Sequence, residues 1–440
     1  MKITQYLKQS WHEAKSKPLY TGLYITGVTL AVALTMIFAN YYFIRISPTY
    51  PEVNRNDTYY LTQCRMHNIA EDYANGYGWY MGSILARDYV QKIKGPECVS
   101  IKYGAVKTLK AKPEFKSDIR EDLNVLENDA KFFKIYEFDF LAGRPFSQEE
   151  FDNKNKVAVI SDIVAEKLYS DCFENIIGKS IFINDIEYRI TGIVKHCSQL
   201  CTESYADAYC AIDYDNVREM NDRILGPFTA VFLIRNDKQL DDTKKELENI
   251  RNQIAGLYEG WELVIGDQPK SHIRTIMQDI QDSSDEEFSW WKIIRNNMLI
   301  VIVLLLVPAL NMSGMISGRM ENRQSEIGIR KSFGATKSSL LSQLFIENML
   351  YTLIGAFLGL IISWSVLYFN MKQIIVMFDP YALYSISAET EPEVSFGMLF
   401  SPEVFFTTII VIFVFNSLSA IVPAWWALRQ NIVNSLNNNR

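Results

Sequence analysis

The sequence predicts an α+β membrane protein, in which four transmembrane helices carry a large two-part extracytoplasmic domain. Of the 440 residues, 48% are apolar and 22% are charged, but the charges are unevenly distributed. Four windows of about 20 residues carry almost no charge, and a long segment between the first two windows has the composition of a soluble domain. These observations exclude a purely soluble enzyme, a many-span carrier, a disordered chain and a collagen-like fibre.

The four apolar windows are predicted to span a bilayer. They cover residues 21–44, 296–317, 348–369 and 403–423. A cleaved signal peptide is the alternative for the first window. That window is longer than the usual apolar region of roughly 7 to 15 residues, and no small-residue cleavage site follows it. We therefore expect an uncleaved first span.

Lysine and arginine near the ends of the windows predict the orientation. The first 20 residues hold four lysines and one acid, and the connection 318–347 is rich in arginine and lysine. Both segments are expected on the cytoplasmic side, whereas the net charge of -7 leaves the outer parts acidic. The expected order is a cytoplasmic amphipathic helix that contacts membrane lipid (1–20), a first span (21–44), an extracytoplasmic domain (45–292), a second span (296–317), a cytoplasmic hairpin (318–347), a third span (348–369), a short outer loop (370–402), a fourth span (403–423) and a cytoplasmic tail (424–440).

Within the extracytoplasmic domain, two segments repeat the order strand, helix, strand. The first has strands at 58–66 and 97–106 around a helix at 81–94. The second has strands at 228–236 and 261–266 around a helix at 238–257. Two such units favour a split, ferredoxin-like layer formed by about 48–114 and 215–290, with a β-rich insertion at 115–214 between them.

All six cysteines fall in the extracytoplasmic domain, which suits an oxidising compartment. Cys197, Cys201 and Cys210 lie closest together in the chain and are the candidates for a local disulfide, although six cysteines allow about 15 full pairings. A metal site at His196, Cys197 and Cys201 is the alternative. No second ligand pair completes it at zinc spacing, so we expect no metal site.

No motif for catalysis is present, so we expect no enzyme activity and no catalytic residue. Gly178, Lys179 and Ser180 resemble the end of a phosphate-binding loop, but Phe173 stands where that motif needs glycine and an alternating strand pattern follows. A phosphate-binding loop would instead lead into a helix. We also expect no nucleic-acid partner.

Small residues four positions apart occur in two of the windows. Gly314 and Gly318 belong to the second window, and Gly355 and Gly359 belong to the third. Such spacing lets two helix backbones approach closely. The partner helix is either another span of the same chain or a span of a second subunit, and the sequence leaves both open.

The cytoplasmic hairpin carries the most specific pattern in the chain. Residues 326–336 read EIGIRKSFGAT, and Glu347 follows before the third span. This pattern resembles the FtsX-like permeases of ATP-binding-cassette (ABC) systems, in particular their MacB-type branch. The segments FLAGRPFSQEE (140–150), KVAVISDIVAEKLY (156–169) and IGKSIFINDIEYRITGIV (177–194) are similar to that branch's periplasmic core. Pro423, Ala424 and Ala427 resemble the family's closing segment, but its usual later proline is absent.

The resemblance implies a permease subunit of a MacB-type ABC transporter in a bacterial inner membrane. It would act as a homodimer or heterodimer with a separate cytoplasmic ATPase, and ATP and Mg would bind that ATPase, whereas this chain would bind no cofactor. Motion would pass to the periplasmic domain for efflux, with a periplasmic adaptor or an outer-membrane channel as further partners. The alternatives are an FtsX-like signalling module that regulates a cell-wall hydrolase, and a lipoprotein-release permease. The residues implied to couple to the ATPase are Glu326, Gly328, Arg330, Lys331, Gly334, Ala335 and Glu347.

Overall fold

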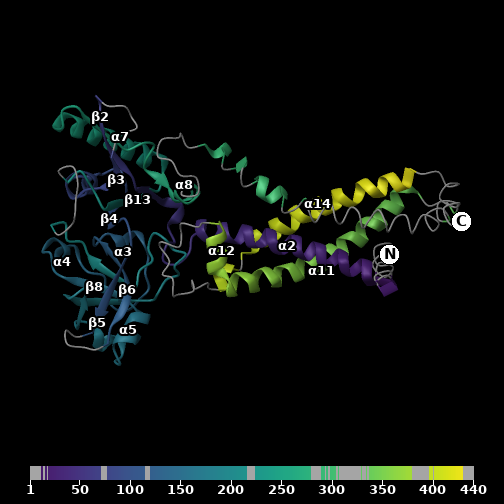
Figure 1. Ribbon diagram of the computed structural model, residues 1–440, viewed down its shortest axis with the longest axis horizontal. Coiled ribbons are helices and arrows are strands. Elements are labelled where there is room, and N and C mark those ends of the chain that lie inside the picture. The colour runs from purple at the N-terminus through teal and green to yellow at the C-terminus, as the bar shows by residue number, and fades with distance from the viewer. Residues whose placement is uncertain are drawn as a thin grey trace. The chain divides into compact units, whose positions relative to one another are not determined.

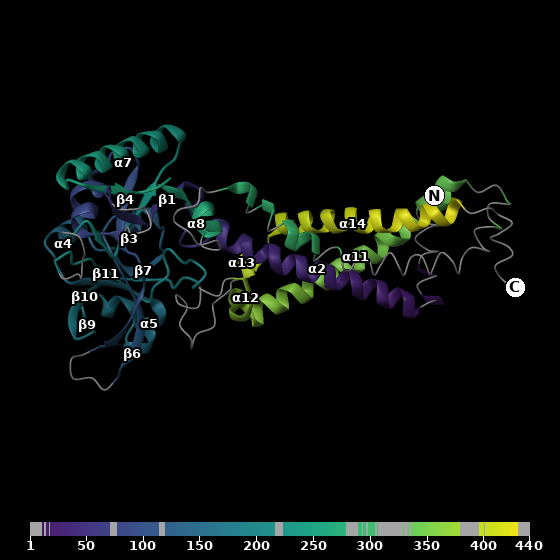
Figure 2. The same cartoon turned by 45° about the horizontal axis from the view of Figure 1, so that its top comes forward.

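The protein forms two compact units, which we describe separately. The computed structural model describes residues 11–12, 15–16, 18–70, 77–113, 119–215, 223–278, 289–292, 294–295, 298–303, 306, 329, 333, 336–378, 396–399 and 401–429. The helical unit comprises residues 1–44, 288–377 and 394–440, and the outer unit comprises residues 45–287 and 378–393. Figures 1 and 2 label their elements.

Three long apolar helices dominate the helical unit. They are α2 (Pro18–Ile46), α11 (Lys337–Phe369) and α14 (Pro402–Arg429), with the short helices α12 (Met371–Phe378) and α13 (Phe396–Leu399) beside them in the chain. Among the described residues, Thr21–Ile46 and Phe345–Phe369 are long and apolar enough to cross a membrane, and α14 contains a shorter apolar stretch, Pro402–Leu418. Most of the predicted second span lies outside the described residues.

The outer unit is built on strands that pair into one extended, mostly antiparallel sheet. Along its main path the strands run β11, β8, β10, β9, β5, β6, β4, β13, β3, β2 and β14. The strands are β1 (Thr58–Leu61), β2 (Cys64–Asn68), β3 (Tyr77–Met81), β4 (Cys98–Tyr103), β5 (Lys107–Lys112), β6 (Glu121–Asn128), β7 (Phe140–Gly143), β8 (Val157–Ser161), β9 (Ser180–Ile183), β10 (Ile186–Val194), β11 (Ala208–Ala211), β12 (Leu225–Gly226), β13 (Phe228–Leu233), β14 (Trp261–Val264) and β15 (Lys270–Ser271).

Helices in the outer unit are short, apart from one. The long helix is α7 (Asp237–Leu257), which begins at the Asn236 cap and buries Leu247, Ile250 and Ile254. These positions are three and four residues apart and therefore share one face. The others are α3 (Phe132–Ile135), α4 (Gln148–Asp152), α5 (Asp162–Leu168), α6 (Phe173–Ile176) and α8 (His272–Gln278).

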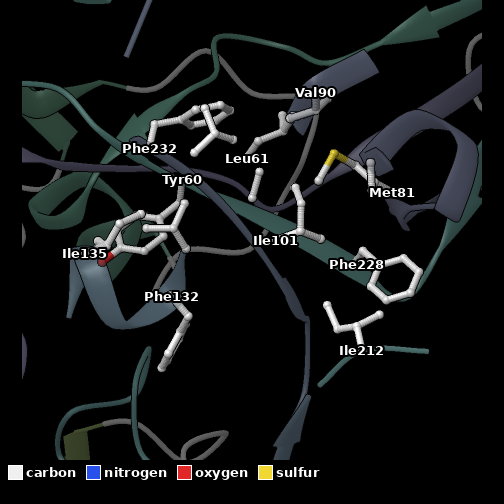
Figure 3. Close-up of a cluster of buried hydrophobic side chains, with 14 of the residues drawn as sticks. Tyr60, Leu61, Met81, Val90, Ile101, Phe132, Ile135, Ile212, Phe228 and Phe232 are labelled. Carbon is white, nitrogen blue, oxygen red and sulfur yellow. The ribbon is translucent and has the colours of Figure 1, made fainter. Parts of the chain in front are cut away.

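Two hydrophobic cores lie on opposite faces of strands such as β11. In β11, Tyr209 belongs to the larger core, whereas Ala208 and Cys210 belong to the smaller core, because successive side chains on a strand point to opposite faces. The larger core contains aromatic residues such as Phe132 and Phe228, part of which Figure 3 shows. Helices α5 and α6 cover the smaller core.

Two predicted elements differ from the structure. The predicted strand 58–66 is broken between β1 and β2, where the Gln268 side-chain oxygen accepts from the backbone N–H groups of Thr62 (2.8 Å) and Gln63 (3.3 Å). A side-chain amide thus replaces the strand ladder at that point. The predicted helix 81–94 is instead a π-helical turn (Leu85–Tyr89) followed by a 3₁₀ turn (Val90–Lys92).

Candidate coupling site

Of the predicted coupling hairpin 318–347, the structure describes Ile329, Phe333 and residues 336–347. Glu326, Gly328, Arg330, Lys331, Gly334 and Ala335 lie outside the described residues. Ile329 and Phe333 are described, and they are 51% and 88% exposed. The Phe333 backbone N–H donates to the Ile329 carbonyl at 3.1 Å, which is the hydrogen bond of one helical turn. Residues four apart lie on one helix face, so the hairpin presents an exposed apolar pair.

This pair was not among the residues predicted to couple to the ATPase. Charged residues and glycines dominate the sequence pattern of the hairpin, and most of the predicted coupling residues are of these types. A phenylalanine at a predicted cytoplasmic turn, between Lys331 and Gly334, is nevertheless a usable signal. The Phe333 side chain is 88% exposed, which leaves its ring available for contact.

Glu347, the last predicted coupling residue, lies inside α11 and is 2% exposed. Its Oε1 accepts a hydrogen bond from the Tyr351 hydroxyl, 3.2 Å away and one helical turn further along the chain. The Tyr351 ring in turn packs edge-on against the Tyr24 ring of α2, with ring centroids 5.7 Å apart. The structure thus places Glu347 within the helix packing.

The third-window glycines bring α11 against α2 of the same chain. A Cβ atom added to Gly355 would lie 2.7 Å from Val28 Cγ1. At Gly359 it would lie 2.7 Å from Val32 Cβ and 2.8 Å from the Thr29 carbonyl oxygen. Neither position has room for a larger side chain, so both glycines serve packing within one subunit. Gly314 and Gly318 lie outside the described residues.

A polar contact joins α11 to α14 in the same unit. The Asn416 amide nitrogen donates to the Thr352 hydroxyl at 3.2 Å, and both side chains are buried. Interhelical hydrogen bonds of this kind fix the rotation of one apolar helix against another. Together with the glycine contacts, this bond places α2, α11 and α14 in one packed group.

The six cysteines are free thiols in this structure. Cys197 lies in the larger core, where its Sγ is 3.7 Å from the Tyr209 hydroxyl, and the Cys201 thiol donates to the Tyr50 carbonyl at 3.4 Å. Cys210 points into the smaller core on the opposite face of β11. Of the three candidates, Cys197 and Cys201 therefore remain the pair for a local disulfide.

We predict that protein isolated from its native compartment contains at least one intramolecular disulfide, formed by Cys197 and Cys201, because their compartment permits oxidation. Mass spectrometry of peptides prepared without reduction measures this. Cys210 should be found as a free thiol in the same digest. Six free thiols would contradict the prediction.

Within the described residues, no group of three or more His, Cys, Asp or Glu side chains could hold a metal ion. The His196 ring, weighed as a ligand in the sequence, lies with its Nδ1 atom 2.9 Å from Asp162 Oδ1. Asp162 also accepts from the His196 backbone N–H at 2.9 Å. The Asp162 carboxylate is therefore a hydrogen-bond partner of the His196 imidazole.

Comparison with known protein families decides the relationship of the chain. Residues 21–250, more than half of its length, match the MacB-like periplasmic core domain, and residues 298–432 match the FtsX-like permease C-terminal region. The chain belongs to the MacB-type family of ABC transporter permeases. The resemblance seen in the hairpin and outer segments is thereby confirmed.

Individual relatives are distant from this permease and differ in length. It is 22% identical over 239 residues to the pyoverdine export ATP-binding/permease protein PvdT of Pseudomonas syringae pv. syringae, covering 54% of this chain and 34% of that protein. It is 24% identical over 237 residues to the uncharacterized ABC transporter permease YknZ of Bacillus subtilis, covering 51% and 52%. It is 29% identical over 232 residues to the macrolide export ATP-binding/permease protein MacB of Chlorobaculum tepidum, covering 51% and 33%. The matches thus span about a third to a half of these relatives.

Proposed function

We propose that this chain is the permease subunit of a MacB-type ABC transporter in a bacterial inner membrane. A cytoplasmic ATPase grips the hairpin 318–347, and its ATP-driven closure moves the membrane helices and, through them, the extracytoplasmic domain. Substrate is extruded from the periplasmic side. The permease acts as a dimer, and ATP and Mg bind the ATPase.

The observation that carries this proposal is the exposed pair Ile329 and Phe333. Apolar side chains at the centre of a protein interface, surrounded by charges, are the usual anchors of binding energy. Here the neighbouring charges are those of Glu326, Arg330 and Lys331. The hairpin therefore combines an apolar anchor with charged groups that orient a partner.

The membrane arrangement proposed here has four spans, with both termini cytoplasmic. Apolar helices α2, α11 and α14 support the first, third and fourth spans, and the apolar window 296–317 supports the second. Outside the membrane, we propose a split, ferredoxin-like layer. Its support is antiparallel pairing of β2 with β14, of β1 with β13 and of β13 with β4, which interleaves the two strand–helix–strand segments.

Accessibility to a membrane-impermeant thiol reagent tests the orientation. In a background without native cysteines, a cysteine at position 238, exposed on α7, should react in intact cells. A cysteine at position 337 should react only after the membrane is opened, because it precedes the third span from the inside. Labelling of position 337 from outside would contradict the four-span arrangement.

Hairpin variants test the coupling role. Replacing both Glu326→Ala and Arg330→Ala removes charge-assisted contacts that contribute about 1.5 to 3 kcal/mol each. Affinity for the ATPase should then fall by about 100-fold or more. Phe333→Ser should act similarly by removing the apolar anchor, and Gly334→Val should displace the hairpin by straining its turn. ATPase co-purification and ATP hydrolysis by the complex measure these effects.

A matched control removes the same two charge types elsewhere. Glu248 and Arg251 form an exposed ion pair on α7 of the outer unit, so Glu248→Ala with Arg251→Ala should leave ATPase binding unchanged. All variants should express and insert at the level of the unaltered chain. Equal ATPase binding by the hairpin and control variants would overturn the coupling assignment.

A further inference from the structure

A buried polar cluster lies where the chain passes from the first apolar helix into the outer unit and where it leaves that unit again. Helix α2 ends at Ile46, and the departing segment is β15 followed directly by α8. Strand β15 pairs with β1, so that Tyr59 lies opposite Ser271 and Tyr60 lies opposite Lys270. The arriving and departing segments are thus hydrogen-bonded neighbours. We call Glu52, Arg55, Tyr60, Ser204 and His272 the junction cluster.

His272, the first residue of α8, holds the end of α2. Its ring is 1% exposed, and its Nε2 lies 2.8 Å from the carbonyl oxygen of Arg45. A carbonyl only accepts, so Nε2 carries the hydrogen, while Nδ1 lies 3.2 Å from the Tyr60 hydroxyl. Burial lowers the pKa of His272, which favours the neutral ring.

Arg55 holds the next turn of the chain. Its Nη1 donates to the Ser47 carbonyl at 2.7 Å, and its Nε donates to Glu52 Oε2 at 2.7 Å. Both charged side chains are 1% exposed. Burial alone would raise the pKa of Glu52, but the Arg55 charge and the hydrogen bonds outweigh it and hold that pKa below its ordinary value.

Glu52 extends the cluster into the insertion. Its Oε1 accepts from the Ser204 hydroxyl at 2.8 Å, from the Ser204 backbone N–H at 3.0 Å and from the Glu203 backbone N–H at 3.2 Å. Ser204 belongs to the loop between β10 and β11. A continuous set of bonds therefore leads from the end of α2 to both parts of the outer unit.

The chemistry of the junction cluster is better suited to passing on a movement of α2 than to merely anchoring that helix. The last carbonyls of a helix lack partners within the helix, and here an imidazole and a guanidinium serve the Arg45 and Ser47 carbonyls. A buried ion pair contributes less stability than apolar packing of equal volume, yet its bonds are directional. Such bonds hold one geometry, so a shift of the helix end displaces whatever is bonded to it.

We propose that His272 and Arg55 are positioning residues that clamp the outer end of the first membrane helix, and that Glu52 passes its displacement to the loop 198–207. This inference rests on the proposed function, because it supplies the route by which ATP-driven movement reaches the extracytoplasmic domain. The clamp belongs to this chain alone and needs no group from the ATPase.

Two substitutions of His272 test the clamp in the full chain, reconstituted in nanodiscs with its ATPase. His272→Gln keeps an N–H donor near the Nε2 position, whereas His272→Leu fills the space without a donor. Amide hydrogen exchange of residues 198–207 is compared with and without trapped ATP, and ATP hydrolysis is recorded in parallel. His272→Met, which also lacks the donor, replaces His272→Leu if the latter does not fold.

The expected results separate the clamp from the proposed function. His272→Leu should bind the ATPase and hydrolyse ATP within about twofold of the unaltered chain. The ATP-dependent change in exchange at 198–207 should fall to less than about half, and His272→Gln should retain it. An unchanged response in His272→Leu, or in His272→Met where that variant replaces it, overturns the clamp alone. An unaltered chain that neither binds the ATPase nor responds to ATP overturns the proposed function as well.

Discussion

Replacing Glu52 by glutamine is expected to lower the free energy of unfolding of the outer unit by about 3 to 5 kcal/mol. The substitution removes the Glu52 carboxylate charge from beside the Arg55 guanidinium, and both side chains are 1% exposed. It also leaves only one acceptor oxygen, so amide hydrogens face the donors of either Arg55 or Ser204. Pulsed thiol labelling of the full chain in urea measures unfolding of this unit, because the buried thiols of Cys64 and Cys210 react only when it opens.

Two controls accompany the Glu52→Gln variant. Glu248→Gln, at an exposed pair, should change stability by no more than about 0.5 kcal/mol. The difference between Glu52→Gln and the unaltered chain should shrink as pH falls below about 4, because a carboxyl with a lowered pKa stabilises the folded state only while it is ionised. Equal stability of both glutamine variants at pH 7 would contradict the assigned ion pair.

The variant Gly359→Val should separate α2 from α11. Its Cβ alone would lie 2.7 Å from Val32 Cβ and 2.8 Å from the Thr29 carbonyl oxygen, and a backbone oxygen cannot give way as a side chain can. Overpacking of this kind costs about 1 to 3 kcal/mol. We expect a lower midpoint of thermal unfolding in detergent. Size-exclusion chromatography of the heated protein measures this midpoint.

Gly22→Val provides the matched control, because it places the same side chain in α2 where no atom lies within 4 Å of the added Cβ. This variant should keep the thermal midpoint of the unaltered chain. If Gly359→Val were as stable as Gly22→Val, the two helices could not be packed through Gly359.

Local sequence signals predicted much of the helical unit. The apolar windows 21–44 and 348–369 correspond to α2 and α11, since a run of about 20 apolar residues is a property of one segment. The small-residue spacing in the third window predicted close approach. It did not predict that Val28 and Val32 of the first window form the opposing surface, because the partner helix is set by tertiary packing.

Long-range contacts in the outer unit escaped prediction for the same reason. Glu52 and Ser204 are 152 positions apart, and the sequence near either residue gives no signal that predicts their hydrogen bond. The Gln268 side chain interrupts the predicted strand 58–66, although the β-branched and aromatic residues of that segment favour a continuous strand. Alternation along β11, by contrast, is a local property, and it is enough to place Tyr209 and Cys210 on opposite faces of that strand.

The coupling residues were predicted from the family pattern, in which charged residues and glycines are prominent. The pattern did not single out Phe333, whose exposure is a property of the folded chain rather than of its neighbours in sequence. Glu347 differs from Phe333 in its exposure. The family pattern includes it, and in the structure it is buried within α11, where it accepts a hydrogen bond from Tyr351.

Amide hydrogen exchange of the assembled permease and ATPase tests the central claim most directly. Exchange is measured for the unaltered chain in the nucleotide-free state and with ATP trapped. Transmission predicts that trapped ATP alters exchange in the hairpin 318–347 and also in residues 45–57 and 270–278 of the outer unit. A change confined to the hairpin, with identical exchange throughout residues 45–287 in both states, would contradict it.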